Sequence, residues 1–272
     1  MIYLNGHLLP DDQTRIDPAD RGFLLGDGIF ETMRSYQGRI FRLDAHLDRL
    51  FSGAEYLGIP VPLVRDELAR GVSATLDANQ LSNRGASLRL TLTRGPGPRG
   101  LIPPPRPQPT VLITAAPLTQ TRFPPAKTII AKDIRRNEHA PSSKIKSLNY
   151  LDNILARQQA EQSGADEALL LNTAGHLAEA STANLFIVRE GKLQTPPIGD
   201  GALPGITRSV VLELAAKLGF PAEETSITAD DLPSADEAFL TNSIIEIRPL
   251  VQVERQWLGD GRMGEITRAL QR

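Results

Sequence analysis

The sequence contains no cysteine, and this absence excludes several kinds of site at once. Disulfide bonds, zinc–thiolate centres, iron–sulfur clusters and cysteine nucleophiles all require a thiol. Also absent is any apolar run close to the roughly 18–20 residues that a membrane-spanning helix needs. The first residues lack the charged start and the apolar stretch of a signal peptide. We therefore expect a cytoplasmic protein with no membrane partner.

A strong excess of charge of one sign is missing too. The 272 residues include 30 basic and 32 acidic side chains, which gives a formal net charge of −2. This balance does not draw the molecule as a whole to nucleic acid. The sequence has no P-loop or H-E-x-x-H motif, and its four histidines show no metal-ligand spacing. We expect neither a nucleic-acid partner nor a bound metal.

Lysine is scarce, because only six of the 30 basic residues are Lys and none lies in the first 126 residues. A compositional bias toward arginine is enough to explain the ratio. The scarcity still limits any chemistry that needs a primary amine to six side chains. Two of them, Lys144 and Lys146, would point to the same side of an extended segment. Such a pair is either a solvated surface feature or part of a site.

Hydrophobic periodicity and turn residues predict the elements of each half of the chain. Strands are expected at 1–4, 7–9, 29–35, 39–42, 86–93, 110–115, 168–171, 185–188 and 238–241. Helices are expected at 43–57, where Asp44 is the predicted N-cap, and at 62–76, 149–162 and 207–217. Strands and helices alternate without a regular βαβ repeat, so a mixed α/β fold is favoured over a doubly wound sheet.

A proline-containing stretch at 118–125 predicts a linker. It separates an N-terminal domain, residues 1–117, from a C-terminal domain, residues 126–272. A second proline-rich stretch, residues 94–109, has seven prolines in 16 residues and is expected to form a surface loop. This loop is either a rigid connector or a shaped lid that carries Arg94 or Arg99 to an anionic ligand.

Three further features suggest a site. Glu179 lies between small residues and an apolar strand, where a carboxylate tends to be partly buried and to need a cationic or hydrogen-bonded partner. Residues 203–208 form a Pro-Gly turn into a helix, and the backbone N–H groups at a helix start can bind an anion. Thr241 begins a polar segment after an apolar strand.

A scarce lysine, a buried carboxylate and a helix N-terminus together match the needs of pyridoxal 5'-phosphate. The lysine supplies the covalent bond, the carboxylate holds the ring nitrogen protonated, and the helix N-terminus takes the phosphate. The spacing alone leaves this as one hypothesis among several.

Six motifs in order carry a resemblance to a known family. The chain resembles the class IV aminotransferases, the fold-type IV pyridoxal-phosphate family, along essentially its whole length. The resemblance implies a smaller N-terminal α/β domain, a larger C-terminal pseudo-barrel domain, and a homodimer in which one subunit closes the active site of the other. The motifs are Asp20–Arg34, His46–Leu50, Ile145–Tyr150, Ala178–Phe186, Leu203–Arg208 and Thr241–Pro249.

The resemblance also implies roles for individual residues. Lys146 matches the lysine that forms the aldimine with the cofactor and later moves the substrate α-proton, which makes Lys144 a bystander. Glu179 matches the carboxylate that pairs with the pyridinium nitrogen. Tyr150 matches a residue that bonds the cofactor 3-oxygen in some members, although an ordinary half-buried aromatic would fit equally well. The residues matching the phosphate site are Arg49, Ile206, Thr207 and Thr241.

The subgroup is less well defined by the motifs. Our first expectation is a transaminase that moves an amino group between D-amino acids or (R)-amines and a 2-keto acid. Phe30, Arg99 and Leu101 stand where D-amino acid enzymes typically carry Tyr, Arg and His, so only the arginine is retained. The first alternative is aminodeoxychorismate lyase. The second is a branched-chain aminotransferase, against which Thr32 counts mildly, since those enzymes usually have Gly there.

Overall fold

The computed structural model describes all 272 residues and divides them into two compact units. Unit 1 comprises Met1–Thr121 and Ile145–Asn149, and unit 2 comprises Arg122–Lys144 and Tyr150–Arg272. Residues 118–125 contain no helix or strand, and the first boundary falls within them. The short segment Ile145–Asn149 packs with unit 1, although the predicted domain division assigns it to the C-terminal part.

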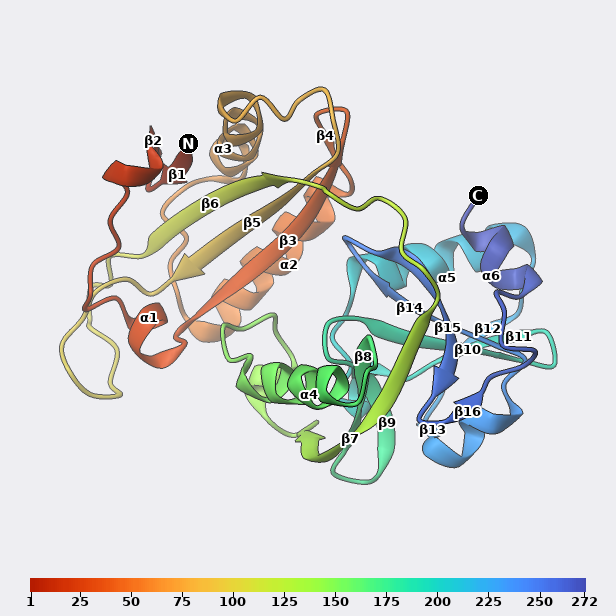
Figure 1. Cartoon of the computed structure of the whole chain (residues 1–272). Coiled ribbons are helices and arrows are strands. Elements are labelled where there is room, and N and C mark those ends of the chain that lie inside the picture. Colours follow the sequence, from red (N-terminus) through yellow and green to blue (C-terminus); the bar gives the residue numbers. More distant parts are fainter. The chain divides into compact units, whose positions relative to one another are not determined.

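Unit 1 is built on a six-stranded antiparallel sheet with the strand order β2-β1-β6-β5-β3-β4 (Figure 1). Its strands are β1 (Ile2–Leu4), β2 (His7–Leu9), β3 (Gly28–Tyr36), β4 (Arg39–Ile40), β5 (Ala86–Thr93) and β6 (Thr110–Pro117). Its helices are α1 (Arg21–Leu25), α2 (Leu43–Leu57) and α3 (Arg65–Ala78), with a 3-10 turn at Asp11–Gln13. The strand pairs and the helix at 43–57 confirm the predictions for this half.

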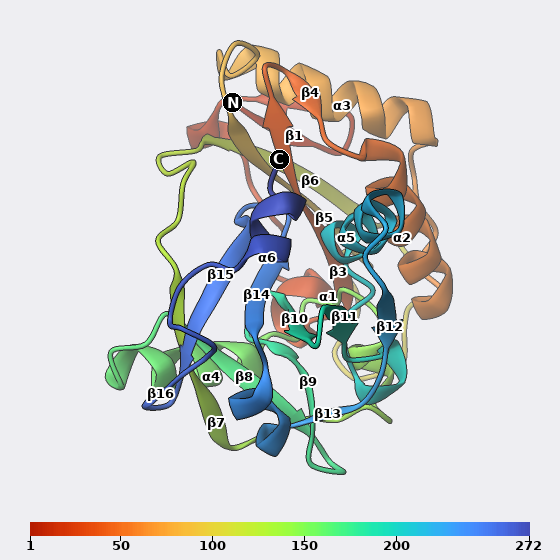
Figure 2. The ribbon, with the colours of Figure 1, turned by 90° about the vertical axis from the view of Figure 1, so that its right-hand side faces the viewer.

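The two faces of this sheet differ in character. Met33 on β3 is paired with Leu88 on β5, and both belong to the core that packs against α2 and α3 (Figure 2). Because side chains alternate along a strand, the neighbouring pair Thr32 and Arg89 points to the opposite face. Phe30 shares that second face. One face of unit 1 is therefore apolar core, and the other presents polar and charged groups.

The helix starts differ from the predictions. Asp44 is not the N-cap of α2: that position is taken by Arg42, which has a left-handed backbone with φ of 53°. Asp44 lies in the first turn, where a carboxylate still interacts favourably with the helix dipole. Helix α3 begins at Arg65, three residues after the predicted start, because the Glu67 side chain reaches back and accepts a hydrogen bond from the Val64 N–H.

Unit 2 contains a curled ten-stranded sheet with the path β12-β11-β10-β14-β15-β7-β8-β9-β13, and β16 joins it beside β15. The strands are β7 (Ala126–Arg136), β8 (Glu167–Asn172), β9 (His176–Ala180), β10 (Asn184–Arg189), β11 (Lys192–Thr195), β12 (Ala222–Glu224), β13 (Ile227–Thr228), β14 (Glu237–Asn242), β15 (Glu246–Val253) and β16 (Gln256–Trp257). The expected mixed α/β fold with a pseudo-barrel second half is confirmed.

Three helices complete unit 2. Helix α4 (Leu151–Gln162) contacts β7 and β8, whereas α5 (Ile206–Leu218) and α6 (Glu265–Leu270) contact β14 (Figure 1). Three 3-10 turns lie at Pro141–Ser143, Ile198–Asp200 and Ala229–Ser234. None of the helices combines the length and the apolar character needed to cross a membrane.

Two central strands of unit 2 were not predicted. Strand β7 carries charged residues along its length, and Asp133 takes a left-handed backbone where the register against β8 shifts. Strand β15 includes Arg248 and Pro249, which weaken the sequence pattern of a strand. Tertiary pairing on both sides overrides these local signals, since each strand lies between two others in the sheet.

Candidate active site

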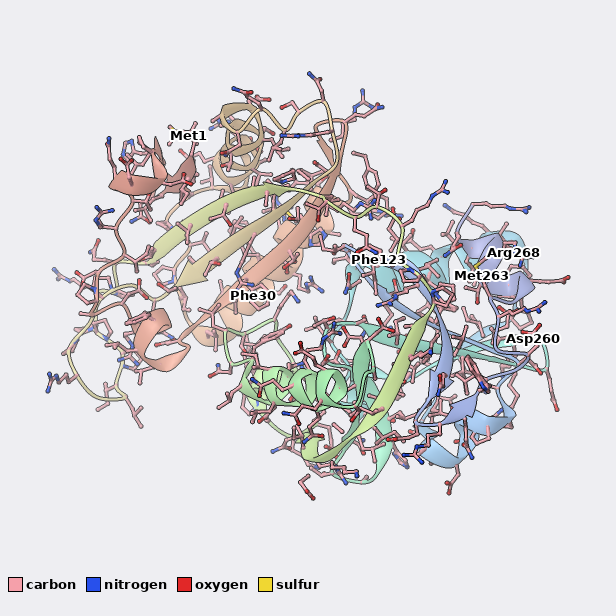
Figure 3. The ribbon with its side chains drawn as sticks, viewed as in Figure 1. Met1, Phe30, Phe123, Asp260, Met263 and Arg268 are labelled. Atoms are coloured by element: carbon pink, nitrogen blue, oxygen red, sulfur yellow. The ribbon has the colours of Figure 1, made fainter.

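Lys146 lies beside β3 in unit 1. Ser147 forms a β-bridge with Ile29, and the Phe30 N–H donates to the Lys146 carbonyl oxygen at 3.0 Å. The Lys146 Nζ atom is 4.5 Å from the centre of the Phe30 ring. The lysine and the aromatic residue that the sequence singled out are thus brought together, and Figure 3 labels Phe30 on its strand.

Lys144 does not share this environment. It follows the 3-10 turn Pro141–Ser143 with φ of −82° and ψ of −14°, which is a helical backbone, and its side chain is exposed. The expectation that Lys144 and Lys146 point to the same side of an extended segment is therefore wrong. Of the two amines, only that of Lys146 is half-buried.

Arg89 is a residue of this region that sequence reasoning missed. Its guanidinium carbon lies 3.7 Å from the centre of the Phe30 ring, within the range of a cation–π contact. The sequence of β5 could have revealed it, because core and non-core residues alternate along this strand. Arg89 and Thr91 lie on the same face of the sheet as Phe30. Arg89 and Lys146 therefore both contact the same aromatic ring.

Arg49 belongs to a buried ion cluster between α2 and β3. Its Nε and Nη2 atoms donate to the two carboxylate oxygens of Glu31, at 2.7 and 2.6 Å. His46, one helical turn before Arg49, places its Nδ1 atom 2.6 Å from the same carboxylate. Burial alone would raise the pKa of Glu31, but the hydrogen bonds and charges of Arg49 and His46 outweigh it and hold the pKa below its usual value.

The predicted substrate residues Arg99 and Leu101 lie on the proline-rich loop between β5 and β6. Both side chains are exposed, and that of Leu101 is 82% accessible. Arg94 behaves differently, because it is buried, pairs with Asp27 at 2.8 Å and donates to the carbonyls of Leu57 and Gly58. The hypothesis that Arg94 reaches an anionic ligand is therefore wrong.

In unit 2, Glu179 lies on β9 and is only 6% exposed. One of its carboxylate oxygens accepts a hydrogen bond from the Leu203 N–H at 2.9 Å. The other lies 3.4 Å from the Nε atom of Arg136. The structure thus supplies the buried, partnered carboxylate that the sequence pattern indicated.

The start of α5 lies close to Glu179 through the segment that contains Leu203. Gly205 is the N-cap, without a capping side chain, and the first turn has no acidic residue. Asn184 donates to the Leu203 carbonyl at 2.9 Å, and a Cβ atom on Gly205 would lie 2.0 Å from the Asn184 Oδ1. Only glycine fits at this position. Because no capping side chain or acidic residue occupies the helix start, the backbone N–H groups of Ile206 and Thr207 are available to an anion.

Thr241 is the cross-strand partner of Asn184 on β14. Its side chain is 1% exposed, and its Oγ1 atom is buried without a hydrogen-bond partner. A buried hydroxyl without a partner is uncommon in proteins, and a polar ligand or a water molecule can supply the missing bond. The hydroxyl and the α5 N-terminus, linked through Asn184, fit the phosphate of a cofactor. Tyr150, half-buried, is the N-cap of α4.

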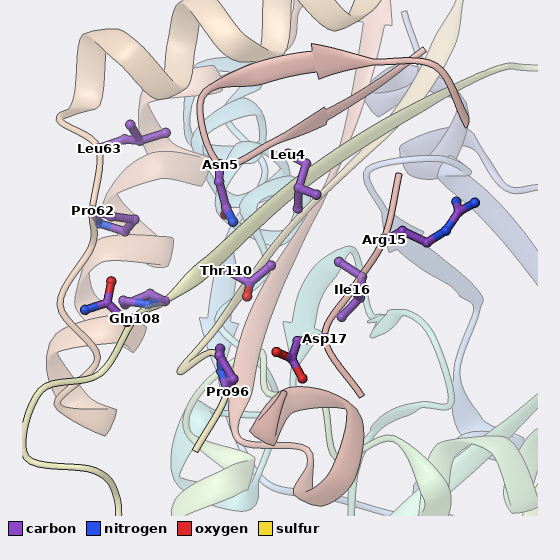
Figure 4. A pocket seen from close by; sticks show the side chains of 11 residues that line it. Leu4, Asn5, Arg15, Ile16, Asp17, Pro62, Leu63, Pro96, Gln108 and Thr110 are labelled. Atoms are coloured by element: carbon purple, nitrogen blue, oxygen red, sulfur yellow. The ribbon is translucent and has the colours of Figure 1, made fainter. Parts of the chain in front are cut away.

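One cavity of unit 1 lies apart from these residues. It has a volume of about 460 Å³ and is shown in Figure 4. Its lining side chains include Leu4, Arg15, Ile16, Leu63 and Pro109, and no predicted site residue lines it.

Comparison with known proteins adds independent information. The family model described as amino-transferase class IV matches residues 28–253. A putative branched-chain-amino-acid aminotransferase of Methanocaldococcus jannaschii is 39% identical over 270 residues, which cover 99% of this chain and 93% of the relative. A D-alanine aminotransferase of Listeria monocytogenes is 34% identical over 274 residues, with coverage of 99% and 93%.

Solved structures give a similar picture. The branched-chain amino acid aminotransferase of Escherichia coli matches with a TM-score of 0.94 at 28% identity, over 99% of this chain and 91% of that chain. The branched-chain amino acid aminotransferase of T.th. with pyridoxamine 5'-phosphate matches with a TM-score of 0.91 at 29% identity, over 99% and 90%.

Proposed function

The chain belongs to the class IV aminotransferases, enzymes that use pyridoxal 5'-phosphate, and on that premise we propose that its amino donors are branched-chain and other apolar α-amino acids. A 2-keto acid is the acceptor. The observation that favours a donor with a carboxylate is Arg89, whose guanidinium contacts the same Phe30 ring as the Lys146 amine. A guanidinium at this ring can pair with the carboxylate of an amino acid or a keto acid.

We propose Lys146 and Arg49 as residues that bind the cofactor, and likewise Glu179, Ile206, Thr207 and Thr241. The unpartnered Thr241 hydroxyl and the uncapped start of α5 suit a phosphate group. The buried Glu179 carboxylate suits a protonated ring nitrogen. Tyr150 is a further candidate because it borders the Lys146 segment in sequence.

Pyridoxal phosphate, when bound, supplies an electron-withdrawing ring that stabilises the electron pair left when a substrate carbon loses its proton. The protein must remove that proton and return it, which is the task of the Lys146 amine as general base and acid. The hydrogen bond from the Phe30 N–H to the Lys146 carbonyl and the bridge at Ser147 fix the main chain at Lys146 and at the next residue. Precise placement of the base is what makes proton transfer efficient.

Glu31 supports the same chemistry from a distance. Its bidentate bond to Arg49 fixes the orientation of the guanidinium plane, because two parallel N–H···O bonds allow little rotation. Arg49 can then present its charge to the phosphate without first losing side-chain entropy. Glu31 is thus proposed as a positioning residue, and Arg49 as the residue that contacts the phosphate.

The similar proteins bear on the choice among the candidate substrates more than the geometry does. The archaeal relative and the E. coli structure support branched-chain donors, so this alternative now precedes D-amino acids and (R)-amines. The Listeria relative and the retained Arg99 favour D-amino acids as a second candidate. Amines without a carboxylate are disfavoured by Arg89.

A panel of amino donors tests the proposal. The purified holoenzyme is given L-leucine, L-isoleucine, D-alanine or (R)-1-phenylethylamine with 2-oxoglutarate, and the keto product is measured. We expect the highest kcat/KM with the branched-chain donors. Preference for D-alanine would support the second candidate. Release of 4-aminobenzoate and pyruvate from aminodeoxychorismate, without transamination of any donor, would instead identify a lyase.

The two neighbouring lysines offer a matched test of the site. Lys146→Ala should lower kcat by at least about a thousandfold, because the proton-transfer base is lost. The same variant should lose the visible absorption of the covalently attached cofactor. Lys144→Ala should leave both unchanged, since Lys144 is exposed. If Lys144→Ala abolishes activity while Lys146→Ala retains it, the assignment is wrong.

We also propose that two copies of the chain pair and that the exposed loop of one copy serves the site of the other. Mixing two inactive variants tests this arrangement. Lys146→Ala and Arg99→Ala chains that exchange subunits form a hybrid with one site that has both Lys146 and Arg99. Recovery of up to about a quarter of the wild-type activity supports action between subunits, because half of the dimers in a random mixture are hybrids and each hybrid has one intact site of two. No recovery in a mixture shown to contain hybrids would contradict it.

A further inference from the structure

The loop that carries Arg99 and Leu101 is fixed at its base by Asp20. This side chain is fully buried, and one of its carboxylate oxygens accepts hydrogen bonds from Thr93 at 2.9 Å and Thr110 at 2.7 Å. Thr93 ends β5 and Thr110 begins β6, so a single carboxylate ties the two ends of the loop together. The base of the loop is therefore closed by buried hydrogen bonds at its two ends.

The tip of the loop is held by the next residue, Arg21. Its Nη1 and Nη2 atoms donate to the carbonyl oxygens of Gly100 and Leu101, at 2.9 and 3.0 Å, and its Nε donates to Asp27 at 2.8 Å. The residue is only 4% exposed. All three nitrogens of the guanidinium are engaged, and two of them bind consecutive carbonyls of one exposed segment.

Asp27 anchors this arrangement to the rest of unit 1. The same carboxylate oxygen accepts from Arg21 and from Arg94, both at 2.8 Å. Arg94 in turn donates to the carbonyls of Leu57 and Gly58 at the end of α2. Burial would raise the pKa of Asp27, but the hydrogen bonds and charges of the two arginines hold it below the usual value. A rigid path thus runs from α2 to the loop tip.

We propose that Arg21 is a positioning residue that fixes the tip of the 94–109 loop and thereby sets how Arg99 and Leu101 are presented to the substrate. The part of this proposal that concerns substrate rests on the proposed function. A planar guanidinium with a fixed fork of donors can bind two carbonyls and a carboxylate together, whereas a lysine ammonium cannot span all three. The Arg21 side chain is buried among these partners, so its role is to hold the backbone rather than to meet the ligand.

Proteolysis of the holoenzyme tests the structural part of the proposal. Trypsin can cut the Arg99–Gly100 bond, whereas the Arg106–Pro107 bond resists because proline follows. Loss of the two carbonyl contacts in Arg21→Lys should speed the appearance of the fragment that begins at Gly100 by about tenfold, because cleavage follows the population of the opened loop. Cleavage at the exposed Arg122 serves as an internal reference.

Arg106→Lys is the matched control, since it makes the same change at an exposed arginine of the same loop. In this variant, trypsin should cut the Arg99–Gly100 bond at the wild-type rate. An unchanged rate at Arg99 in Arg21→Lys, measured on folded protein, would overturn the proposal. This experiment needs no substrate, so it decides the loop-fixing role even if the proposed amino donors are wrong.

Kinetics test the consequence for substrate. If only about a tenth of the Arg21→Lys molecules hold the loop in place, the KM for the amino donor should rise about tenfold, with kcat within about twofold of wild type. Gly100→Ala gives a second route that leaves the buried arginine untouched. Gly100 has φ of +112°, so a Cβ strains the loop tip although nothing lies within 4 Å of it.

Arg21→Lys and Gly100→Ala should both raise the KM for the amino donor and leave kcat nearly unchanged. A purely structural role for Arg21 predicts a lower melting temperature with an unchanged KM, and that result would overturn the proposal. If wild type transaminates none of the donors, the proposed function fails, and the proteolysis alone decides the role of Arg21.

Discussion

Unit 1 contains two buried ion clusters, each built around a single carboxylate. In the first, Glu31 binds one arginine through both of its oxygens and a histidine through one. In the second, one oxygen of Asp27 is shared by two arginines, whose remaining donors go to backbone carbonyls. Glu31 is 1% exposed, whereas the Asp27 side chain is 15% exposed. The first cluster orients a side chain, and the second fixes pieces of main chain.

The difference has a physical cause. A bidentate carboxylate fixes the plane of a guanidinium, which matters when that guanidinium must meet an anion. A guanidinium that binds carbonyls fixes the backbone, which matters when a loop must hold its shape. We therefore expect damage to the Glu31 cluster to alter phosphate binding and damage to the Asp27 cluster to alter loop order.

The largest effect is expected from Glu31→Gln. The change removes the charge of a buried carboxylate that pairs with the half-buried Arg49 and should lower the free energy of unfolding by about 3–5 kcal/mol. It should also weaken cofactor binding, measured as the dissociation constant for pyridoxal phosphate. Glu55→Gln, on the exposed side of α2, is the control and should change neither quantity. Normal cofactor affinity in Glu31→Gln would contradict the positioning role.

Asp27→Asn should cost less, about 2–3 kcal/mol of unfolding free energy, because both arginines keep their carbonyl partners and the site is partly solvated. The expected signature is faster tryptic cleavage after Arg99 with unchanged affinity for pyridoxal phosphate. Asp12→Asn, an exposed aspartate of the same unit, is the control. If Asp27→Asn weakens cofactor binding as strongly as Glu31→Gln does, the two clusters do not have separate roles.

These clusters also show where prediction from sequence reaches its limit. The alternation of β5 predicted that strand with its observed bounds, because local periodicity alone defines a half-buried strand. Glu31 and Arg49 are 18 residues apart, and their pairing depends on how α2 packs on the sheet. Arg21 donates hydrogen bonds to carbonyls that lie 79 and 80 residues away in the sequence, and hydrophobic periodicity cannot predict such contacts.

The candidate site was predictable to the extent that motifs identify single residues. Lys146 and Glu179 were found from a resemblance, and the structure gives them the partial burial and the partners that such roles need. Arg89 was missed, although its alternation with core leucines placed it on the polar face. Arg89 is relevant to the site because it contacts the Phe30 ring. This contact depends on the register between β3 and β5, which the sequence does not reveal.

The acid sensitivity of the two clusters provides a third prediction. Glu31 and Asp27 both have a pKa below the ordinary value in the folded state. Each therefore contributes stability that is present above its unfolded pKa and is lost as the pH falls through its folded pKa. Between about pH 5 and about pH 3, wild type should lose more unfolding free energy than Asp27→Asn does. Parallel curves for the two proteins would contradict the ionised state of Asp27.

His46→Gln should have the smallest effect of the four. Since Glu31 is ionised and can only accept, the His46 Nδ1 must carry the proton that it shares, and a glutamine amide can donate in its place. Arg49 keeps both of its bonds to the carboxylate. We expect a loss of about 1 kcal/mol or less and a nearly unchanged dissociation constant for the cofactor.

His46→Leu sharpens this comparison, because leucine removes the donor and leaves the Arg49 bonds as the only support for Glu31 in the cluster. Its unfolding free energy should fall further than that of His46→Gln, while cofactor affinity should still exceed that of Glu31→Gln. If His46→Gln weakens cofactor binding as much as Glu31→Gln does, then the histidine, and not the bidentate pair, orients Arg49. The distinction between a cluster that orients a side chain and one that fixes a loop would then need a different physical basis.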